Sequence, residues 1–302
     1  MKTLYFDCFS GISGDMVIGA LLDAGGDPQL LVEELKKLRF EDEYKLDWKK
    51  VVKNGITSTK FDVILKNEDS DHTHEHHHSH DHGHEHDHHH EHTHDHHQEE
   101  GHKHLHRHEH NHDHHHAHEN VHHSHDHDHH HHHSHRAYKD IVKMIEESEL
   151  APQVKEMSLK IFKKIGEAEG LIHGLPLEKV HFHEVGAVDS IIDIVGAAIL
   201  LQQLEIATIK SSSVPVGTGK IHIDHGIYPV PAPATLEILK GVPIEQSDIR
   251  FELTTPTGAG IISVLTDEFC SFPSMKVTAI GYGAGTKTFN DCPNVLRVII
   301  GE

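Results

Sequence analysis

The chain has 302 residues, 41 of them histidine, and a formal net charge of −21 with histidine counted as neutral. This acidic balance, without any cluster of Lys and Arg, argues against nucleic-acid binding, and the longest charge-free apolar run, 194–201, is far shorter than the roughly 20 residues of a membrane-spanning helix. Three scattered cysteines, and the absence of a signal-peptide core before Asp7, favour a reducing cytoplasm.

Most of the histidines belong to one tract, residues 71–135. The tract holds 36 of the 41 histidines and 14 acidic residues against Lys103 and Arg107, so it contributes −12 of the net charge and leaves −9 for the other 237 residues. Its few apolar side chains cannot offset the entropy of ordering, so we expect a disordered insertion in the absence of metal. A purification tag is disfavoured because the tract is internal and irregular.

Imidazole is a preferred ligand of Ni, Cu and Zn, so the tract predicts metal buffering or delivery. Adjacent histidines within it are expected metal ligands: His76, His77, His88, His89, His130 and His131. The tract alone does not name the metal.

Hydrophobic periodicity and cap signals predict the elements on either side of the tract. Before it, in chain order, we expect a buried strand at 2–9, a helix at 16–24, a helix capped by Asp27 and ending near 38, and a β-hairpin turning at Asn54 and Gly55. After it, we expect helices at 138–148 and 153–170, a strand at 179–185, a helix at 190–204, β structure to 223, helices ending at 239 and spanning 258–268, and strands at 275–282 and 295–300.

This alternation favours an α/β or α+β architecture, a layered sheet covered by helices. The expected organisation is an N-terminal α/β segment with the hairpin at 1–70, the histidine-rich insertion at 71–135, and a main α/β domain at 136–302 that completes the fold.

The segment from His181 to Asp193 carries the densest group of ligand-type side chains outside the tract. On a strand, His181 and His183 share one face, and Asp189 and Asp193 share one face of the following helix start. Together they can converge on one cation, with Asp189, Asp193 and Glu184 as candidate catalytic acids or bases. Two hydrogen-bonded histidines beside ordinary capping acids is the alternative.

Two loops offer backbone N–H groups at a helix start, as an anion such as phosphate requires. The first loop supplies Asp7, Ser10, Gly11, Ser13, Gly14 and Asp15, and the second supplies Thr254, Thr255, Thr257 and Gly258. The first does not match a Walker loop, and on spacing alone a glycine-rich turn with a Ser13 cap, or a threonine N-cap in the second loop, is slightly favoured over an anion site.

Two further histidines, His222 and His225, bracket Asp224 near a turn and are additional metal candidates, although structural roles are the alternative. Cys8 has an apolar flank, which favours a buried small hydrophobe over a nucleophile or thiolate ligand.

Six segments in order resemble the LarC family of nickel insertion proteins. They are FDCFSGISGDM, HFHEVGAVDSIIDIVGAA, HGIYPVPAPATLEILKGVP, ELTTPTGAGI, GYGAGT and PNVLRVIIGE. The resemblance implies that Ni(II) is inserted into pyridinium-3,5-bisthiocarboxylic acid mononucleotide, with a nickel–carbon bond formed between two thiocarboxylate sulfurs and CTP hydrolysed. The product is the nickel-pincer cofactor of lactate racemase.

The resemblance covers the first half of the family only. Full-length members continue into a C-terminal domain to which CTP and its divalent metal, Mg or Mn, are attributed. We therefore expect a separate C-terminal chain as partner, apo-lactate racemase as a possible further partner, and an oligomer. The rival interpretations are a non-catalytic nickel store or metallochaperone and, less favoured, a phosphate-ester enzyme with a zinc-type site.

Overall fold

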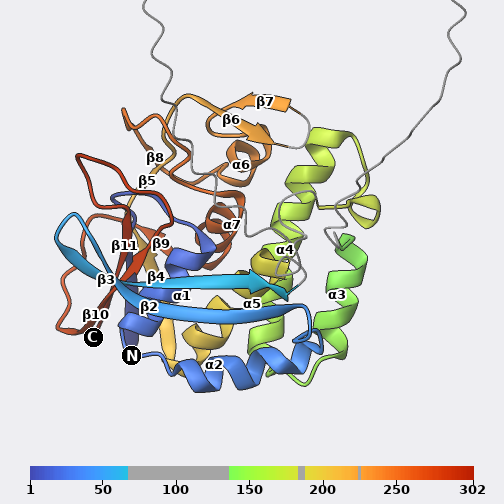
Figure 1. Ribbon diagram of the computed structural model, residues 1–302, viewed down its shortest axis with the longest axis horizontal. Coiled ribbons are helices and arrows are strands. Elements are labelled where there is room, and N and C mark those ends of the chain that lie inside the picture. The colour runs from blue at the N-terminus through green and yellow to red at the C-terminus, as the bar shows by residue number, and fades with distance from the viewer. Residues whose placement is uncertain (67–135, 183–187, 224–225) are drawn as a thin grey trace, which may run out of the picture. The chain divides into compact units, whose positions relative to one another are not determined.

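The computed structural model describes residues 1–66, 136–182, 188–223 and 226–302, and within these ranges it confirms the expected mixed α/β class (Figure 1). The histidine tract falls between the described ranges, as do His183, Glu184 and His225. What was predicted for them therefore stays a prediction.

The described residues build a mixed sheet of seven strands in the order β2-β3-β10-β11-β1-β4-β9. The strands are β1 Lys2–Asp7, β2 Tyr44–Lys53, β3 Ile56–Leu65, β4 Ile206–Ser211, β9 Glu268–Phe269, β10 Val277–Ala284 and β11 Val295–Gly301. Strand β1 lies between antiparallel β11 and parallel β4. Segments before and after the histidine tract therefore share one sheet.

Two small two-stranded sheets complete the β structure of the described residues: β5 Val214–Pro215 with β8 Ile244–Glu245, and β6 Lys220–Ile223 with β7 Gly226–Pro229. The predicted hairpin is confirmed as β2 and β3, with Lys53 opposite Ile56 around the Asn54-Gly55 turn. Asn54 and Gly55 both have positive φ there, which Asn and Gly tolerate best.

The helices begin and end close to the predicted residues. They are α1 Gly14–Asp23, α2 Pro28–Leu35, α3 Tyr138–Glu147, α4 Pro152–His173, α5 Val188–Gln203, α6 Pro233–Ile238 and α7 Pro256–Leu265, with 3-10 turns η1 Lys36–Leu38 and η3 Leu177–Lys179. Asp27 caps α2 as predicted, because its carboxylate accepts from the backbone N–H groups of Gln29 and Leu30. Among the described helices, none has both the length and the apolar character to cross a bilayer.

Helix α1 packs directly on the sheet because glycines remove the side chains that would hold it away. A Cβ on Gly281 or Gly283 of β10 would overlap the backbone of α1 at Ala20 and Met16, and a Cβ on Gly19 would overlap the Thr59 carbonyl of β3. Helix α5, almost wholly buried, covers α1 in turn. These close contacts fix where the first turns of α1 and α5 lie.

The strand predicted at 179–185 is wrong in its described part. Residues 177–179 form the 3-10 turn η3, and His181 makes one isolated bridge with Ala137. The reason is Phe182, whose ring is buried against Tyr138 and Phe162, at centroid distances of 6.3 Å each. The described residues 179–182 are thereby anchored on α3 and α4 and pair with no strand of the sheet.

Candidate functional site

A cavity of about 420 Å³ lies where the first turns of three helices meet. Helix α1 contributes Ser13, Gly14 and Asp15, helix α5 contributes Asp189, Ser190 and Asp193, and helix α7 contributes Thr255, Pro256 and Thr257. The wall is completed by Lys60, Phe61, Asp62 and Val63 of β3 and by Ile221, Glu252 and Thr286. The two predicted anion loops and the predicted pair of aspartates therefore face one cavity.

The two loops are joined to each other by their backbones. Ile12 donates its N–H to the Leu253 carbonyl at 3.0 Å, and Thr255 donates to the Ile12 carbonyl at 3.1 Å. Gly258 allows this approach, because a Cβ there would overlap the Ile12 carbonyl oxygen. The Thr255 hydroxyl accepts from the Gly258 N–H at 3.2 Å, the predicted N-cap of α7. Two helix N-termini are thus held side by side at the cavity.

Asp193 is the most deeply placed acid of the cavity, with 9% of its surface exposed. Its Oδ1 is buried and has no hydrogen-bond partner among the described residues. Gly14 makes room for it, since a Cβ on Gly14 would lie 2.5 Å from the Asp193 Cβ. Burial, and then repulsion from Asp15 and Asp189, raise the pKa of Asp193 well above its usual value, against the opposing effect of Lys60.

Asp189 lies one helical turn before Asp193 and is reached by solvent. Desolvation by the surrounding wall is the main cause that raises the pKa of Asp189, with a further contribution from Asp15, whereas its backbone hydrogen bonds act in the opposite direction. Both acids of α5 are therefore better proton acceptors near neutral pH than an ordinary Asp.

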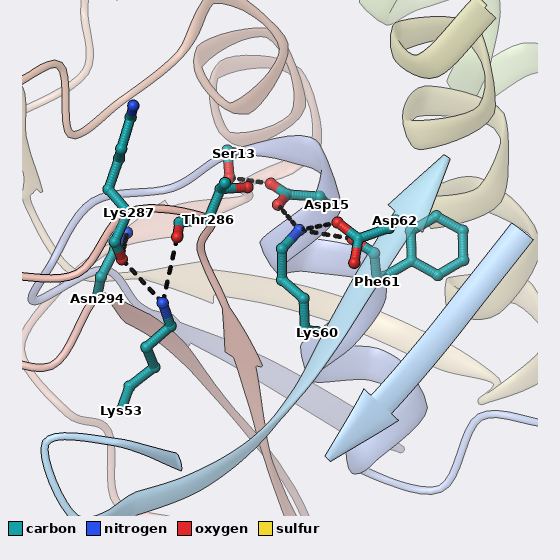
Figure 2. Close-up of polar contacts among 9 residues, drawn as sticks. All are labelled: Ser13, Asp15, Lys53, Lys60, Phe61, Asp62, Thr286, Lys287 and Asn294. Carbon is teal, nitrogen blue, oxygen red and sulfur yellow. Dashed lines mark hydrogen bonds and ion pairs between the residues drawn. The ribbon is translucent and has the colours of Figure 1, made fainter. Parts of the chain in front are cut away.

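Lys60 places an ammonium group between Asp15 and Asp62 (Figure 2). Its Nζ lies 2.8 Å from Asp15 Oδ2, from Asp62 Oδ1 and from the Phe61 carbonyl oxygen, so all three N–H donors are used. Burial lowers the pKa of Lys60, but Asp15 and Asp62 outweigh this and the pKa is raised. Asp15 also accepts from the Ser13 hydroxyl, and Ser13 makes no cap bond to α1 with its side chain.

Several residues predicted for ligand binding lie outside the cavity wall. Asp7 is on the opposite face of β1 from core residues Leu4 and Phe6, and its carboxylate accepts from Arg297. The Ser10 hydroxyl donates to the Pro293 carbonyl at 2.7 Å. The Thr254 hydroxyl is buried on the Pro215 carbonyl. Gly11 and Gly258 support the loops through their backbones.

The histidine part of the predicted metal set is not assembled in the described residues. His181 is exposed and does not line the cavity. His222 alternates along β6 with Ile221, and it is Ile221 that faces the cavity. Across the described ranges, no three His, Cys, Asp or Glu side chains are grouped closely enough to hold a metal ion. A preformed metal cage is therefore absent from this part of the chain.

The sequence analysis missed Lys60 and Asp62. A signal for them was present, because two charged residues two apart on a strand share one face, and here they flank the buried Phe61. Thr286 and Glu252, which also line the cavity, lie in loops where spacing alone assigns no role.

Cys8 is confirmed as a buried residue, with no exposed surface. Burial raises the pKa of its thiol to about 12, so a reactive thiolate is absent at neutral pH. We expect Cys270 and Cys292, which are partly exposed, to react with an aromatic disulfide reagent in the native protein, and Cys8 to react after unfolding in guanidinium. Absorbance of the released thiolate measures both stages. Three fast-reacting thiols in the native protein would contradict this assignment.

The fold and cavity together define an α/β protein that gathers carboxylates, one buried ammonium and helix N-termini around a small-molecule-sized space. The chain belongs to the nickel insertion protein family, whose sequence model matches residues 4–302.

Curated relatives support this membership. A pyridinium-3,5-bisthiocarboxylic acid mononucleotide nickel insertion protein of Geobacillus kaustophilus is 49% identical over all of this chain and 60% of its own length. Proteins of the same name from Clostridium kluyveri and Staphylococcus epidermidis are 44% and 43% identical, over 100% and 99% of this chain and 62% and 59% of theirs. The chain thus spans about 60% of the length of these relatives. Among solved structures, none matches it significantly.

Proposed function

We propose that this chain is the part of a nickel insertion enzyme that binds pyridinium-3,5-bisthiocarboxylic acid mononucleotide and receives Ni(II). The observation that carries the proposal is the cavity where the first turns of α1, α5 and α7 meet. A substrate with a phosphate, a cationic ring and two thiocarboxylates needs N–H donors at one end and acids at the other. Helix N-termini and the aspartates of α5 supply these two kinds of group.

The helix starts suit the phosphate. Ser13 and Gly14 of α1 and Thr255 and Thr257 of α7 line the same space, and the start of a helix is where backbone N–H groups favour an anion. The two loops are hydrogen-bonded to each other, so in this proposal both bind the same phosphate. The two anion sites predicted from the sequence are then a single site.

Asp193 is the proposed base of the metallation step. When the nickel–carbon bond forms, the electron pair of the ring C–H bond passes to nickel and the proton must leave. A buried carboxylate whose pKa is raised is a suitable acceptor of this proton. Asp189 lies nearer to solvent, where it meets the incoming metal, and Glu184 stays a candidate from outside the described residues.

Nickel is proposed to arrive from imidazole ligands. The tract, with pairs such as His76–His77, His88–His89 and His130–His131, is rich in the side chain that Ni(II) prefers, and His181, His183, His222 and His225 are candidates for the last transfer. The absence of a three-ligand group in the described residues fits a metal that passes to the substrate sulfurs and is not retained.

The CTP requirement, its Mg or Mn ion and a separate C-terminal chain also belong to this proposal. They are supported by the resemblance of the six segments to the LarC family. The proposal also includes lactate racemase as the enzyme that uses the product, a cytoplasmic location and an oligomeric state.

Reconstitution tests the proposal. The chain is mixed with the C-terminal part of a relative, the unmetallated mononucleotide, Ni(II) and CTP, and the product is analysed by mass spectrometry. We expect a species heavier by one nickel and lighter by the displaced protons. Nickel binding to the chain without any metallated product, while a full-length relative forms it under the same conditions, would instead favour a nickel store, which the histidine count supports as the second candidate.

A further inference from the structure

The loop that follows β10, Gly285–Thr288, is fastened from two sides. The Gly285 N–H donates to the Asn294 carbonyl at 3.0 Å, and Asn294 Nδ2 donates to the Lys287 carbonyl at 3.0 Å. From the β2–β3 hairpin, Lys53 Nζ donates to the carbonyls of Thr286 and Lys287 at 3.2 and 3.1 Å (Figure 2). It also donates to the Thr288 hydroxyl at 3.1 Å. The backbone of the loop is therefore fixed although its side chains are exposed.

Lys287 projects from this fixed loop on the side away from Lys53 (Figure 2). Its Nζ lies 5.8 Å from the centre of the Phe251 ring, which packs on Phe289 at a centroid distance of 5.6 Å. A cation–π contact of this kind orients an ammonium without neutralising it. In the described part of the chain, no carboxylate forms an ion pair with Lys287, whereas Lys60 is paired with two.

Lys287 and Phe251 line a second cavity, of about 180 Å³, that adjoins the first. The two cavities share Ser13, Asp15, Glu252, Thr255 and Thr286 in their walls, so they lie next to each other. The helix N-termini that suit a phosphate therefore lie between the acids of α5 and the ammonium of Lys287.

The charges of the lining residues decide which of the two cavities favours an anion. The main cavity holds Asp15, Asp62, Asp189 and Asp193 against Lys60, whose three N–H donors are already used. A phosphate dianion deep in that cavity would face repulsion from the aspartates. The second cavity adds the Lys287 ammonium, and of its two acids Asp15 is already compensated by Lys60.

We infer that the loop Gly285–Thr288 and Phe251 form a phosphate-monoester subsite, in which the Lys287 ammonium, together with Ser13 and Thr255, holds the phosphate of a pyridinium mononucleotide. This inference rests on the proposed function, and it gives a ligand-binding role to the end of the GYGAGT segment and to Lys287, which follows it. Lys53 acts as a positioning residue, because it holds the loop and does not reach the cavity wall.

Binding of two probes to the full chain, without nickel, tests the subsite. The probes are nicotinic acid mononucleotide and its riboside, which differ by the phosphate alone, and calorimetry measures each affinity. We expect the mononucleotide to bind more tightly than the riboside. Lys287→Met should weaken the mononucleotide about 10-fold or more, as for loss of a charged hydrogen bond, and leave the riboside unchanged. Lys287→Arg should keep most of the difference in affinity between the mononucleotide and the riboside. Lys276→Met, an exposed control, should keep all of this difference.

The outcomes separate the subsite from the proposed function. If the native chain binds both probes equally, or Lys287→Met binds the mononucleotide as the native chain does, the subsite is wrong while the cavity can still be the insertion site. If the native chain binds neither probe, the cavity is no pyridinium mononucleotide site, and both proposals are overturned. A Lys53→Met variant that loses mononucleotide affinity, and regains it in Lys53→Arg, would support the positioning role.

Discussion

Asp193→Asn is expected to reduce the rate of nickel incorporation on the order of 10²- to 10⁴-fold, the contribution of a positioned base. The amide matches the carboxylate in shape, so it still fits the space that Gly14 provides, but it cannot accept the proton of the ring carbon. Nickel content should remain near that of the native chain, because the histidine tract is untouched. Product mass and bound nickel, measured in the same reconstitution, separate the two effects.

The same variant is expected to unfold at a higher temperature at pH 7–8. The pKa of Asp193 is raised in the folded state, so the folded protein binds its proton more strongly than the unfolded chain. Stability is therefore greatest below the unfolded pKa, near 4, and falls as the pH rises towards the folded pKa. Asparagine has no proton to lose and removes this decline.

Asp42→Asn is the matched control, since Asp42 is exposed and lies outside the cavity. It should change neither the insertion rate nor the pH dependence of unfolding. Two results would contradict the proposed role of Asp193. One is an Asp193→Asn protein that is as active as the native chain. The other is an Asp193→Asn protein whose stability falls between pH 5 and pH 8 as much as that of the native chain.

Lys60→Met is expected to destabilise the fold by about 2–4 kcal/mol, the range for removing one partner of a largely buried ion pair after allowance for the partial exposure of the acids. The side chain of Lys60 is 10% exposed, and those of Asp15 and Asp62 are 25% and 35% exposed. Without the Lys60 ammonium, the negative charges of Asp15 and Asp62 are no longer compensated, and both acids line the same cavity as Asp189 and Asp193. Urea unfolding measures the difference.

Lys50→Met on the neighbouring strand is the control. Lys50 pairs with Asp23, but its own side chain is 60% exposed, so the expected loss is no more than about 1 kcal/mol. Equal losses in the two variants would show that the three contacts of Lys60 do not set it apart from a surface pair.

The helices could be predicted from the sequence because their signals are local. Apolar spacing, the Asp27 cap and prolines at helix starts place α2, α4 and α7 within a few residues of the observed ends. The order of the sheet could not be predicted, because it depends on contacts such as β1 with β11 that join residues almost 300 positions apart. The strand prediction around Phe182 was wrong because this buried side chain packs against helices. Alternation of apolar and polar residues predicts a buried face, but it does not tell whether helices or another strand cover that face.

The candidate site was predicted where its residues begin helices. Ser13, Thr255 and Asp189 belong to strand-to-helix or loop-to-helix transitions, which spacing reveals, and the structure brings all three to one cavity. Lys60 was missed because its partner Asp15 is 45 residues away. His222 does not line the cavity, whereas its neighbour Ile221 does, and the sequence gives the two faces of a strand without saying which one meets the cavity.

Strand β11 is the inner neighbour of both β1 and β10, and this order has a consequence for synthesis. A ribosome delivers β11 some 290 residues after β1, so β1 waits for its antiparallel partner while the residues between the two strands are synthesised. During that interval the histidine-rich stretch has already emerged. Under the proposed function, the nascent polypeptide meets nickel before its cavity exists, so that nickel binding by the tract and folding of the domain occur at different times.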